Sequence, residues 1–381
     1  MSRVVIIAVG SRGDVAPLTG VGVALRQAGH QVTIAAYPPF ADMITNCGLR
    51  FRELPADLQL ADDGAEVSPM KGLAAFASPK GMRALGRDIL SAVADEPADA
   101  LLLSPFAEMV GHSLAEAKDI PSLGIRLQPL SATAWYPPAI LGAWSAGAVG
   151  NRAAANAGAM LVDRLYGGVV AGFRRDLGLP RASARRLRRQ RTAAQWPVLH
   201  GYSPLLAPRP PDWRPGLTVT GYWWPAGTGG WRPPSGLADF LAAGPAPVFV
   251  GFGSMMTTRA RAEQLSDTIR SAAQLAGVRV IVQAGWAALQ VADDHMLTIG
   301  DALEKLCWIS FGHLEADECG AMNLMLAAAP HAEVIHGQLA LMLSLVDMCD
   351  RPPVGAPEEP LDIGGHRLRF IPTRRAVAQA H

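Results

Sequence analysis

Two parts of this sequence open in the same way, with a short apolar run that leads into a glycine-bearing turn. Residues 4–9 are all apolar and precede a turn at 10–14, and the run at 248–252 precedes a turn at 253–254. A strand that is apolar throughout is buried on both faces, as in a parallel sheet that helices cover. The sequence therefore predicts an α/β protein in which the same strand–turn–helix pattern begins twice.

The alternation of strand and helix continues after each of these runs. Further strands are predicted at 32–36, 101–103, 122–125 and 278–282. Helical patterns lie between strands, and two of them end at Gly29 and Gly277, which suit the left-handed backbone that follows many helices. Each part therefore contains at least one strand–helix–strand unit.

A proline-rich stretch separates the two parts. Ten prolines lie in residues 204–247, and proline fixes the backbone angle φ and lacks the N–H that helices and sheets use. A length of 381 residues also fits two domains better than one. We therefore predict an N-terminal domain at 1–203, a linker at 204–247 and a C-terminal domain at 248–381.

Composition limits the partners of the chain. Thirty-four basic residues against 33 acidic ones give a net charge of +1, which is too little to attract a nucleic acid over the whole surface. The eight arginines in residues 174–191 are expected to form a solvent-exposed helix face. Neither a metal-binding histidine spacing nor an apolar run of membrane-spanning length occurs, so we expect no metal and no integral membrane segment. Four cysteines without a C-x-x-C spacing fit a reducing cytoplasm.

Four segments carry a resemblance to a known family: residues 10–17 (GSRGDVAP), 219–225 (VTGYWWP), 248–255 (VFVGFGSM) and 283–286 (QAGW). In this order and spacing they resemble the two-domain glycosyltransferases of the GT-B fold, in particular the bacterial UDP-glycosyltransferases that glycosylate natural products and their sterol glucosyltransferase relatives. The resemblance covers about residues 1–300. It implies two Rossmann-like domains that face a central cleft.

The activity that this resemblance implies is transfer of a sugar, with inversion, from a nucleotide-diphosphate sugar to a hydroxyl of a hydrophobic acceptor. The donor would be linked to UDP or TDP, and the acceptor would be a polyketide, a macrolide or a sterol-like molecule. No cofactor or metal is implied. The oligomeric state stays open.

Asp14 is the candidate catalytic residue. It follows the first strand, at the edge of the sheet where open α/β proteins bind ligands, and a carboxylate there can take the proton of an attacking hydroxyl. Many relatives place a histidine in this loop, and the branch with G-S-R-G-D carries the aspartate. The structural alternative is that Asp14 only caps a helix that starts near Ala16.

The other candidate site residues follow from the resemblance. Acceptor binding is expected at Ser11, Arg12, Trp135 and Tyr136. Donor binding is expected at Gly253, Ser254, Gly285, Trp286 and His336. Backbone N–H groups and the hydroxyl at 253–254 can bind phosphate oxygens without a metal, and the segment at 285–286 would contact the base. The structural alternatives are an ordinary turn at 253–254, a core aromatic at 286 and interdomain packing at 135–136.

The sequence departs from the family after about residue 301. Relatives carry a histidine followed by a glycine-rich turn and, about twenty residues later, an acidic residue followed by glutamine, and neither motif is intact here. His336, followed by Gly337, is the nearest remnant. The alternative function is therefore a non-catalytic, glycosyltransferase-like binding protein with a degenerate donor site.

Overall fold

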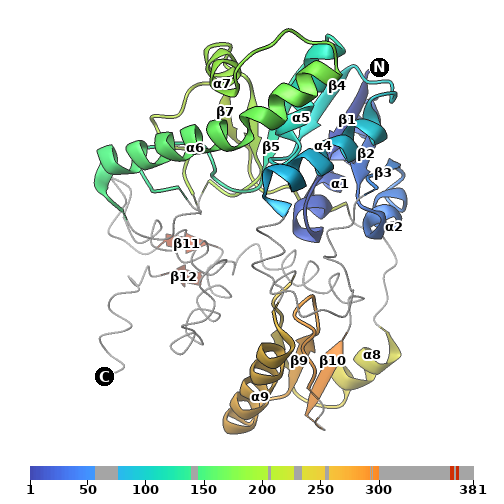
Figure 1. The fold of residues 1–381 in the computed structure, drawn as a ribbon. Helices are drawn as coiled ribbons and strands as arrows, with labels where there is room; N and C mark the ends of the chain where they lie inside the picture. Colours follow the sequence, from blue (N-terminus) through green and yellow to red (C-terminus); the bar gives the residue numbers. More distant parts are fainter. Residues whose placement is uncertain are drawn as a thin grey trace. The chain divides into compact units, whose positions relative to one another are not determined.

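The computed structural model describes residues 1–55, 76–138, 145–204, 207–226, 234–253, 257–291, 293, 295–299, 361–363 and 366–368 (Figure 1). The chain divides into two compact units. The described residues of the first lie in 1–122, 169–181 and 223–309, and those of the second lie in 123–168, 182–222 and 310–381. The domain bounds 1–203, 204–247 and 248–381 stay a prediction.

A seven-stranded sheet is built from strands that lie between residues 3 and 219. Its strands are β1 (Arg3–Ile7), β2 (Gln31–Ala36), β3 (Arg50–Glu53), β4 (Ala100–Leu103), β5 (Ser122–Arg126), β6 (Val198–His200) and β7 (Leu217–Val219). They lie in the order β3-β2-β1-β4-β5-β6-β7, and β1 pairs in parallel with both β2 and β4. Val5, Ile6 and Ile7 are at most 1% exposed. The all-apolar run at 4–9 is thus the central buried strand of an α/β protein, as predicted.

Helices alternate with these strands. They are α1 (Arg12–Gln27), the 3-10 helix η1 (Pro38–Phe40), α2 (Ala41–Thr45), α4 (Pro79–Val93), α5 (Glu108–Ala117), α6 (Gly147–Asp176) and α7 (Ala184–Ala193). Helices α1, α4 and α5 pack against strands of the sheet (Figure 1). Local sequence sets the helix ends: the Ser78 hydroxyl accepts a hydrogen bond from the Gly81 N–H (3.1 Å) at the start of α4, and Gly29 follows α1 with φ +89°. Among the described helices, none combines the length and apolar composition needed to cross a lipid bilayer.

The later part of the chain holds a separate parallel sheet. Its strands are β8 (Val248–Val250), β9 (Val280–Gln283) and β10 (Met296–Ile299), in the order β10-β9-β8. Two helices accompany it in sequence, α8 (Ser235–Ala242) and α9 (Arg259–Ala276), and two short antiparallel strands follow, β11 (Leu361–Ile363) and β12 (His366–Leu368). Gly277 ends α9 in the left-handed conformation (φ +62°), as its position in the sequence predicts.

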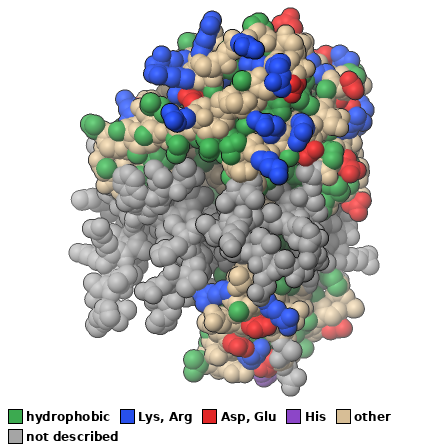
Figure 2. All heavy atoms as spheres, in the orientation of Figure 1, with side chains coloured by type: hydrophobic (Ala, Val, Ile, Leu, Met, Phe, Trp, Pro, Cys, Tyr) green, Lys and Arg blue, Asp and Glu red, His purple; other side chains and the backbone are tan. Residues whose placement is uncertain are grey.

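The arginine-rich stretch is exposed in one part and buried in another. Helix α7 has no buried residue, and basic side chains gather over it in Figure 2, as expected of a solvated face. Arg174, near the end of α6, departs from that expectation because it is only 3% exposed. Its guanidinium donates two hydrogen bonds to the Glu116 carboxylate (2.5 and 2.9 Å), and its Nε donates to the Pro180 carbonyl (2.9 Å).

Replacing this buried arginine is expected to destabilise the fold. Arg174→Ala removes two hydrogen bonds to the Glu116 carboxylate, which is 46% exposed and can be rehydrated, and leaves the Pro180 carbonyl without its donor, so we expect a loss of about 2 kcal/mol in the free energy of unfolding. The matched control is Arg175→Ala, because Arg175 is 76% exposed and, among the described residues, its side chain pairs only with the neighbouring Asp176. That change should cost under about 0.5 kcal/mol. Urea denaturation measures both, and equal losses would contradict the structural role of Arg174.

Candidate functional site

Asp14 lies in the first turn of α1, directly after β1. The helix starts at Arg12 with Ser11 as its N-cap. The alternative in which Asp14 is the N-cap of a helix that begins near Ala16 is therefore wrong in the start of the helix and in the residue that caps it. Asp14 is instead the third residue of the helix and completes a capping box with Ser11. This turn lies at the carboxyl edge of the parallel strands β1, β2 and β4, where open α/β sheets bind their ligands.

The two oxygens of the Asp14 carboxyl group have different surroundings. Oδ2 accepts hydrogen bonds from the Ser11 backbone N–H (2.7 Å) and the Ser11 hydroxyl (3.0 Å). Within the described part of the chain, no group donates a hydrogen bond to Oδ1. Burial raises the pKa of Asp14, and the two hydrogen bonds from Ser11 only partly offset that effect. Ser11 therefore holds this carboxyl group at one oxygen, the other oxygen has no hydrogen-bond donor among the described residues, and the group is more basic than an ordinary aspartate.

Gly10 makes room for this carboxyl group. Its φ is +150°, and a Cβ atom at this position would lie 2.3 Å from Asp14 Oδ2. Ser104, which follows β4 and is 4% exposed, fixes the same loop, since its hydroxyl accepts a hydrogen bond from the Val9 N–H (3.0 Å). Sequence reasoning missed Ser104. The signal was a serine directly after a strand that ends in three leucines. Because parallel strands end at the same edge of a sheet, that serine could have been predicted to lie beside the loop after β1.

The other residues expected in this loop take distinct positions. The Ser11 hydroxyl is bound to Asp14, and Arg12 is half-buried as the first residue of α1. Their roles in acceptor binding stay predictions.

The second expected acceptor segment follows β5. Trp135 is 58% exposed, whereas its neighbour Tyr136 is only 8% exposed and belongs to a buried cluster with Tyr202 and Trp213. The side chain of Trp135 is therefore exposed to solvent, whereas that of Tyr136 is packed in the buried cluster. Acceptor binding by either residue stays a prediction.

A buried histidine lies beside this cluster. His200, at the end of β6, is fully buried, stacks on Trp213 (ring centroids 4.6 Å apart), and its Nδ1 lies 3.2 Å from the Thr218 carbonyl. A carbonyl oxygen only accepts, so Nδ1 carries the proton in that hydrogen bond. Burial lowers the pKa of His200 to about 4. His200 is therefore neutral at pH 7 and has no solvent exposure, which suits a structural role.

The structure brings three of the expected donor residues together. Gly253 ends the described part of the loop after β8, and Gly285 and Trp286 follow β9. The Trp286 N–H donates to the Gly253 carbonyl (3.2 Å), and a Cβ atom at Gly285, where φ is +55°, would lie 2.7 Å from that same oxygen. Ser254 and His336 lie outside the described residues. In the described residues, no three His, Cys, Asp or Glu side chains lie close enough together to hold a metal ion.

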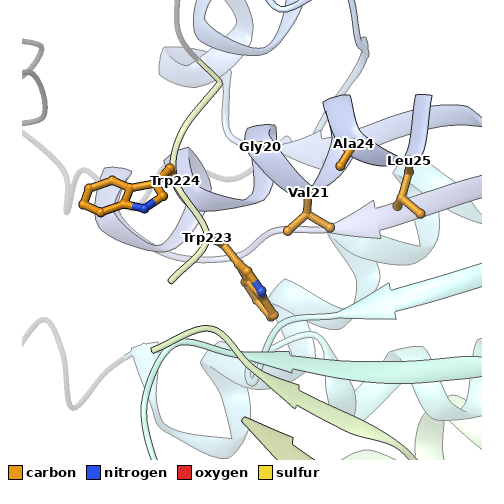
Figure 3. Close-up of a pocket in the computed structure, with 6 residues that line it drawn as sticks. All are labelled: Gly20, Val21, Ala24, Leu25, Trp223 and Trp224. Atoms are coloured by element: carbon orange, nitrogen blue, oxygen red, sulfur yellow. The ribbon is translucent and has the colours of Figure 1, made fainter. Parts of the chain in front are cut away.

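A cavity of about 460 Å³ lies beside the later turns of α1 (Figure 3). It is lined by Gly20, Val21, Ala24, Leu25, Trp223 and Trp224. The segment after β7 packs closely here, because a Cβ atom on Gly20 would collide with the Trp224 carbonyl and the Ala226 N–H donates to the Thr19 hydroxyl (3.0 Å). The cavity contains none of the expected site residues, and we assign it no ligand.

Comparison with known proteins relates the chain to glycosyltransferases. Residues 4–137 match the glycosyltransferase family 28 N-terminal domain. Sterol 3-beta-glucosyltransferases of Candida albicans and Emericella nidulans are each 30% identical to the chain, over 306 and 301 residues. These alignments cover 74% and 75% of this chain but only 19% and 21% of the relatives, so the chain spans about a fifth of their length.

Solved structures show the same fold. The glycosyltransferase of kitacinnamycin and the calicheamicin glycosyltransferase CalG4 each superpose with a TM-score of 0.50, at 16% and 18% identity. Each comparison covers 78% of this chain and 70% of the other. Residues 4–137 therefore match the N-terminal domain of glycosyltransferase family 28, and the chain has the GT-B fold of the glycosyltransferases that it resembles.

Proposed function

We propose that this chain is a glycosyltransferase that moves a sugar from a nucleotide-diphosphate donor to a hydroxyl of a sterol-like acceptor, with inversion at the anomeric carbon. The observation that carries the proposal is the Asp14 carboxyl group, held by Ser11 at the carboxyl edge of the sheet inside the family 28 match. The sterol 3-beta-glucosyltransferases among its relatives support a sterol-like acceptor. The other hydrophobic natural products expected from the sequence are a wider acceptor class for the same chemistry.

In the proposed reaction, Asp14 acts as the general base. The acceptor oxygen attacks the anomeric carbon while its proton passes to Oδ1, the carboxylate oxygen that no described residue engages. The bond from the anomeric carbon to the diphosphate breaks on the opposite face, and the nucleotide diphosphate leaves with the electron pair. The raised pKa of Asp14 suits this role, because a base is more effective when its pKa lies closer to the working pH.

The donor would bind at the loops that follow β8 and β9. Gly253 and Gly285 both have positive φ and leave the two loops in close contact, with Trp286 beside them. Backbone N–H groups and the Ser254 hydroxyl would bind the diphosphate oxygens, so we propose no metal and no further cofactor. UDP and TDP remain the two candidate nucleotides.

The proposed function is tested by incubating the chain with UDP-glucose or TDP-glucose and ergosterol. We expect a sterol glucoside by mass spectrometry, and proton coupling at the anomeric carbon should show a β-glucoside from the α-linked donor. Calorimetric titration with UDP and TDP should show binding of at least one nucleotide. Absence of both transfer and nucleotide binding would favour the non-catalytic alternative.

Ser254 provides a separate test of the donor site. Ser254→Ala is expected to weaken UDP binding about tenfold, since a hydrogen bond to a charged oxygen contributes more than about 1.4 kcal/mol, while binding of uridine should hardly change. Calorimetry measures both ligands. Ser235→Ala, at an exposed serine that begins α8, is the control and should leave both affinities unchanged. Equal losses for UDP and uridine would place the diphosphate elsewhere.

A further inference from the structure

Trp135 is a large aromatic side chain that the fold holds in an exposed position. It is 58% exposed, in a loop that follows β5, and residues on both sides of it are buried: Thr133 is 2% exposed and Tyr136 is 8% exposed. An exposed tryptophan on a firmly held loop is a typical recognition element, since little ordering remains to be done when a ligand binds.

One carboxylate fixes the residues before this tryptophan. Asp212 Oδ1 accepts a hydrogen bond from the Thr133 hydroxyl (2.6 Å), and Asp212 Oδ2 accepts one from the Ala134 N–H (2.8 Å). The Thr133 hydroxyl oxygen in turn accepts a hydrogen bond from the Trp135 N–H (3.1 Å). Three consecutive residues are therefore bound to Asp212, directly or through one hydroxyl.

Helix α6 supports the same arrangement. The Arg152 guanidinium donates to Asp212 Oδ2 (2.5 Å), and the amide nitrogen of Asn151, which is 1% exposed, donates to the Ala134 carbonyl (3.2 Å). Burial raises the pKa of Asp212, but the hydrogen bonds from Thr133, Arg152 and Ala134 outweigh this effect and keep the pKa below its ordinary value. Asp212 is therefore ionised at neutral pH and accepts from all three partners.

The residue after Asp212 belongs to the support on the other side of Trp135. Trp213 is 4% exposed and lies in the same buried cluster as Tyr136. Asp212 and Trp213 are adjacent in sequence. Asp212 binds the residues before the exposed tryptophan, and Trp213 belongs to the same buried cluster as the residue after it.

We infer that Asp212 is a positioning residue that fixes Trp135 as an apolar surface for the ring system of the acceptor. The inference rests on the proposed function for its choice of ligand. Asp212 itself does not touch the acceptor, because its two oxygens are occupied by Thr133, Ala134 and Arg152. Loss of its charge should loosen the loop and weaken acceptor binding, while nucleotide binding stays the same.

The test compares Asp212→Asn with a matched control. Asparagine keeps the size of the side chain, but its NH2 group replaces one acceptor oxygen and so faces a donor. Asp163→Asn is the control, since Asp163 is 13% exposed against 17% for Asp212 and pairs with Arg188 (2.7 Å). Among the described residues, Asp163 makes no hydrogen bond to the loop at 131–138. Thr133→Val is a milder second variant that removes only the bridging hydroxyl.

Three measurements are made on the full chain: amide hydrogen exchange of residues 131–138, the Kd of ergosterol in detergent micelles by tryptophan fluorescence, and the Kd of UDP by calorimetry. For Asp212→Asn we expect at least tenfold faster exchange in 131–138, about tenfold weaker ergosterol binding and unchanged UDP binding. Thr133→Val should also speed exchange and weaken ergosterol binding, but by less. Asp163→Asn should change neither the exchange of residues 131–138 nor the Kd of ergosterol.

Several results would overturn the inference. They are unchanged exchange in Asp212→Asn, faster exchange without weaker ergosterol binding, an equal effect in Asp163→Asn, and a wild-type chain that does not bind ergosterol. None of the readouts needs turnover. Absence of sugar transfer by the wild type would therefore count against the proposed function alone, while exchange and binding still decide the role of Asp212.

Discussion

Asp14→Asn is expected to lower kcat by about two orders of magnitude or more, the usual effect of removing a general base. The variant keeps the shape of the side chain, and its amide oxygen can still accept the hydrogen bonds that Ser11 donates to Oδ2. It cannot take up the proton of the acceptor hydroxyl. Initial rates of glucoside formation at saturating UDP-glucose and ergosterol measure the effect.

Stability separates this catalytic role from a capping role. Because the fold raises the pKa of Asp14, the ionised carboxylate costs stability at neutral pH, and this cost disappears as the pH falls through the raised pKa towards the ordinary one. Asparagine carries no charge, so the melting temperature of the variant at pH 7 should equal or exceed that of the wild type. A clearly lower melting temperature with a proportional fall in activity would assign Asp14 to helix capping alone.

The pH dependence of the rate gives an independent check on the same residue. A general base must be deprotonated, so kcat/KM should fall as the pH drops through the pKa of Asp14. Since burial raises that pKa, this acid limb should lie above the range of an ordinary aspartate. The limb should be missing from the residual activity of Asp14→Asn. An identical acid limb in both proteins would remove Asp14 from the proton transfer.

The fold was predictable from the sequence because strands buried on both faces leave a strong pattern. The apolar run at 4–9 correctly predicted β1, and the glycines at 29 and 277 correctly predicted the ends of α1 and α9. The start of α1 was expected near Ala16, four residues too late. The pattern Ser11-x-x-Asp14 is a capping-box signature and could have placed that start at Arg12.

The site was predictable only where its residues are close in sequence. Asp14 stands in a recognisable loop, and its bonds to Ser11 span three residues. Asp212 bonds to Thr133 across 79 residues, and Ser104 reaches Val9 across 95, so both contacts depend on how the strands are ordered in the sheet. A lone aspartate in a proline-rich stretch carries no local sign of such a contact. The catalytic and binding roles themselves stay predictions.

Gly10→Ala is expected to lower kcat about a hundredfold, although Gly10 contributes no reacting group. The new Cβ atom would lie 2.3 Å from Asp14 Oδ2 and 2.5 Å from its Cβ and Cγ, and φ at this residue is +150°, which residues with a side chain rarely adopt. The Asp14 carboxyl group must therefore move or the loop must change its course. A displacement of about 1 Å is enough to cost about a hundredfold in a reaction that depends on alignment.

A second glycine in the same loop is the control for this prediction. Among the described residues, a Cβ atom on Gly13 would meet only the Ser11 hydroxyl, at an ordinary contact distance of 3.7 Å. Gly13 is also the second residue of α1, and alanine is a better helix former than glycine. Gly13→Ala should therefore keep nearly full activity and equal or higher stability. If both variants lost activity alike, the loop would need flexibility rather than a fixed carboxylate. If Gly10→Ala stayed fully active, the position of Asp14 would not limit the rate, and the base would have to be sought in another residue.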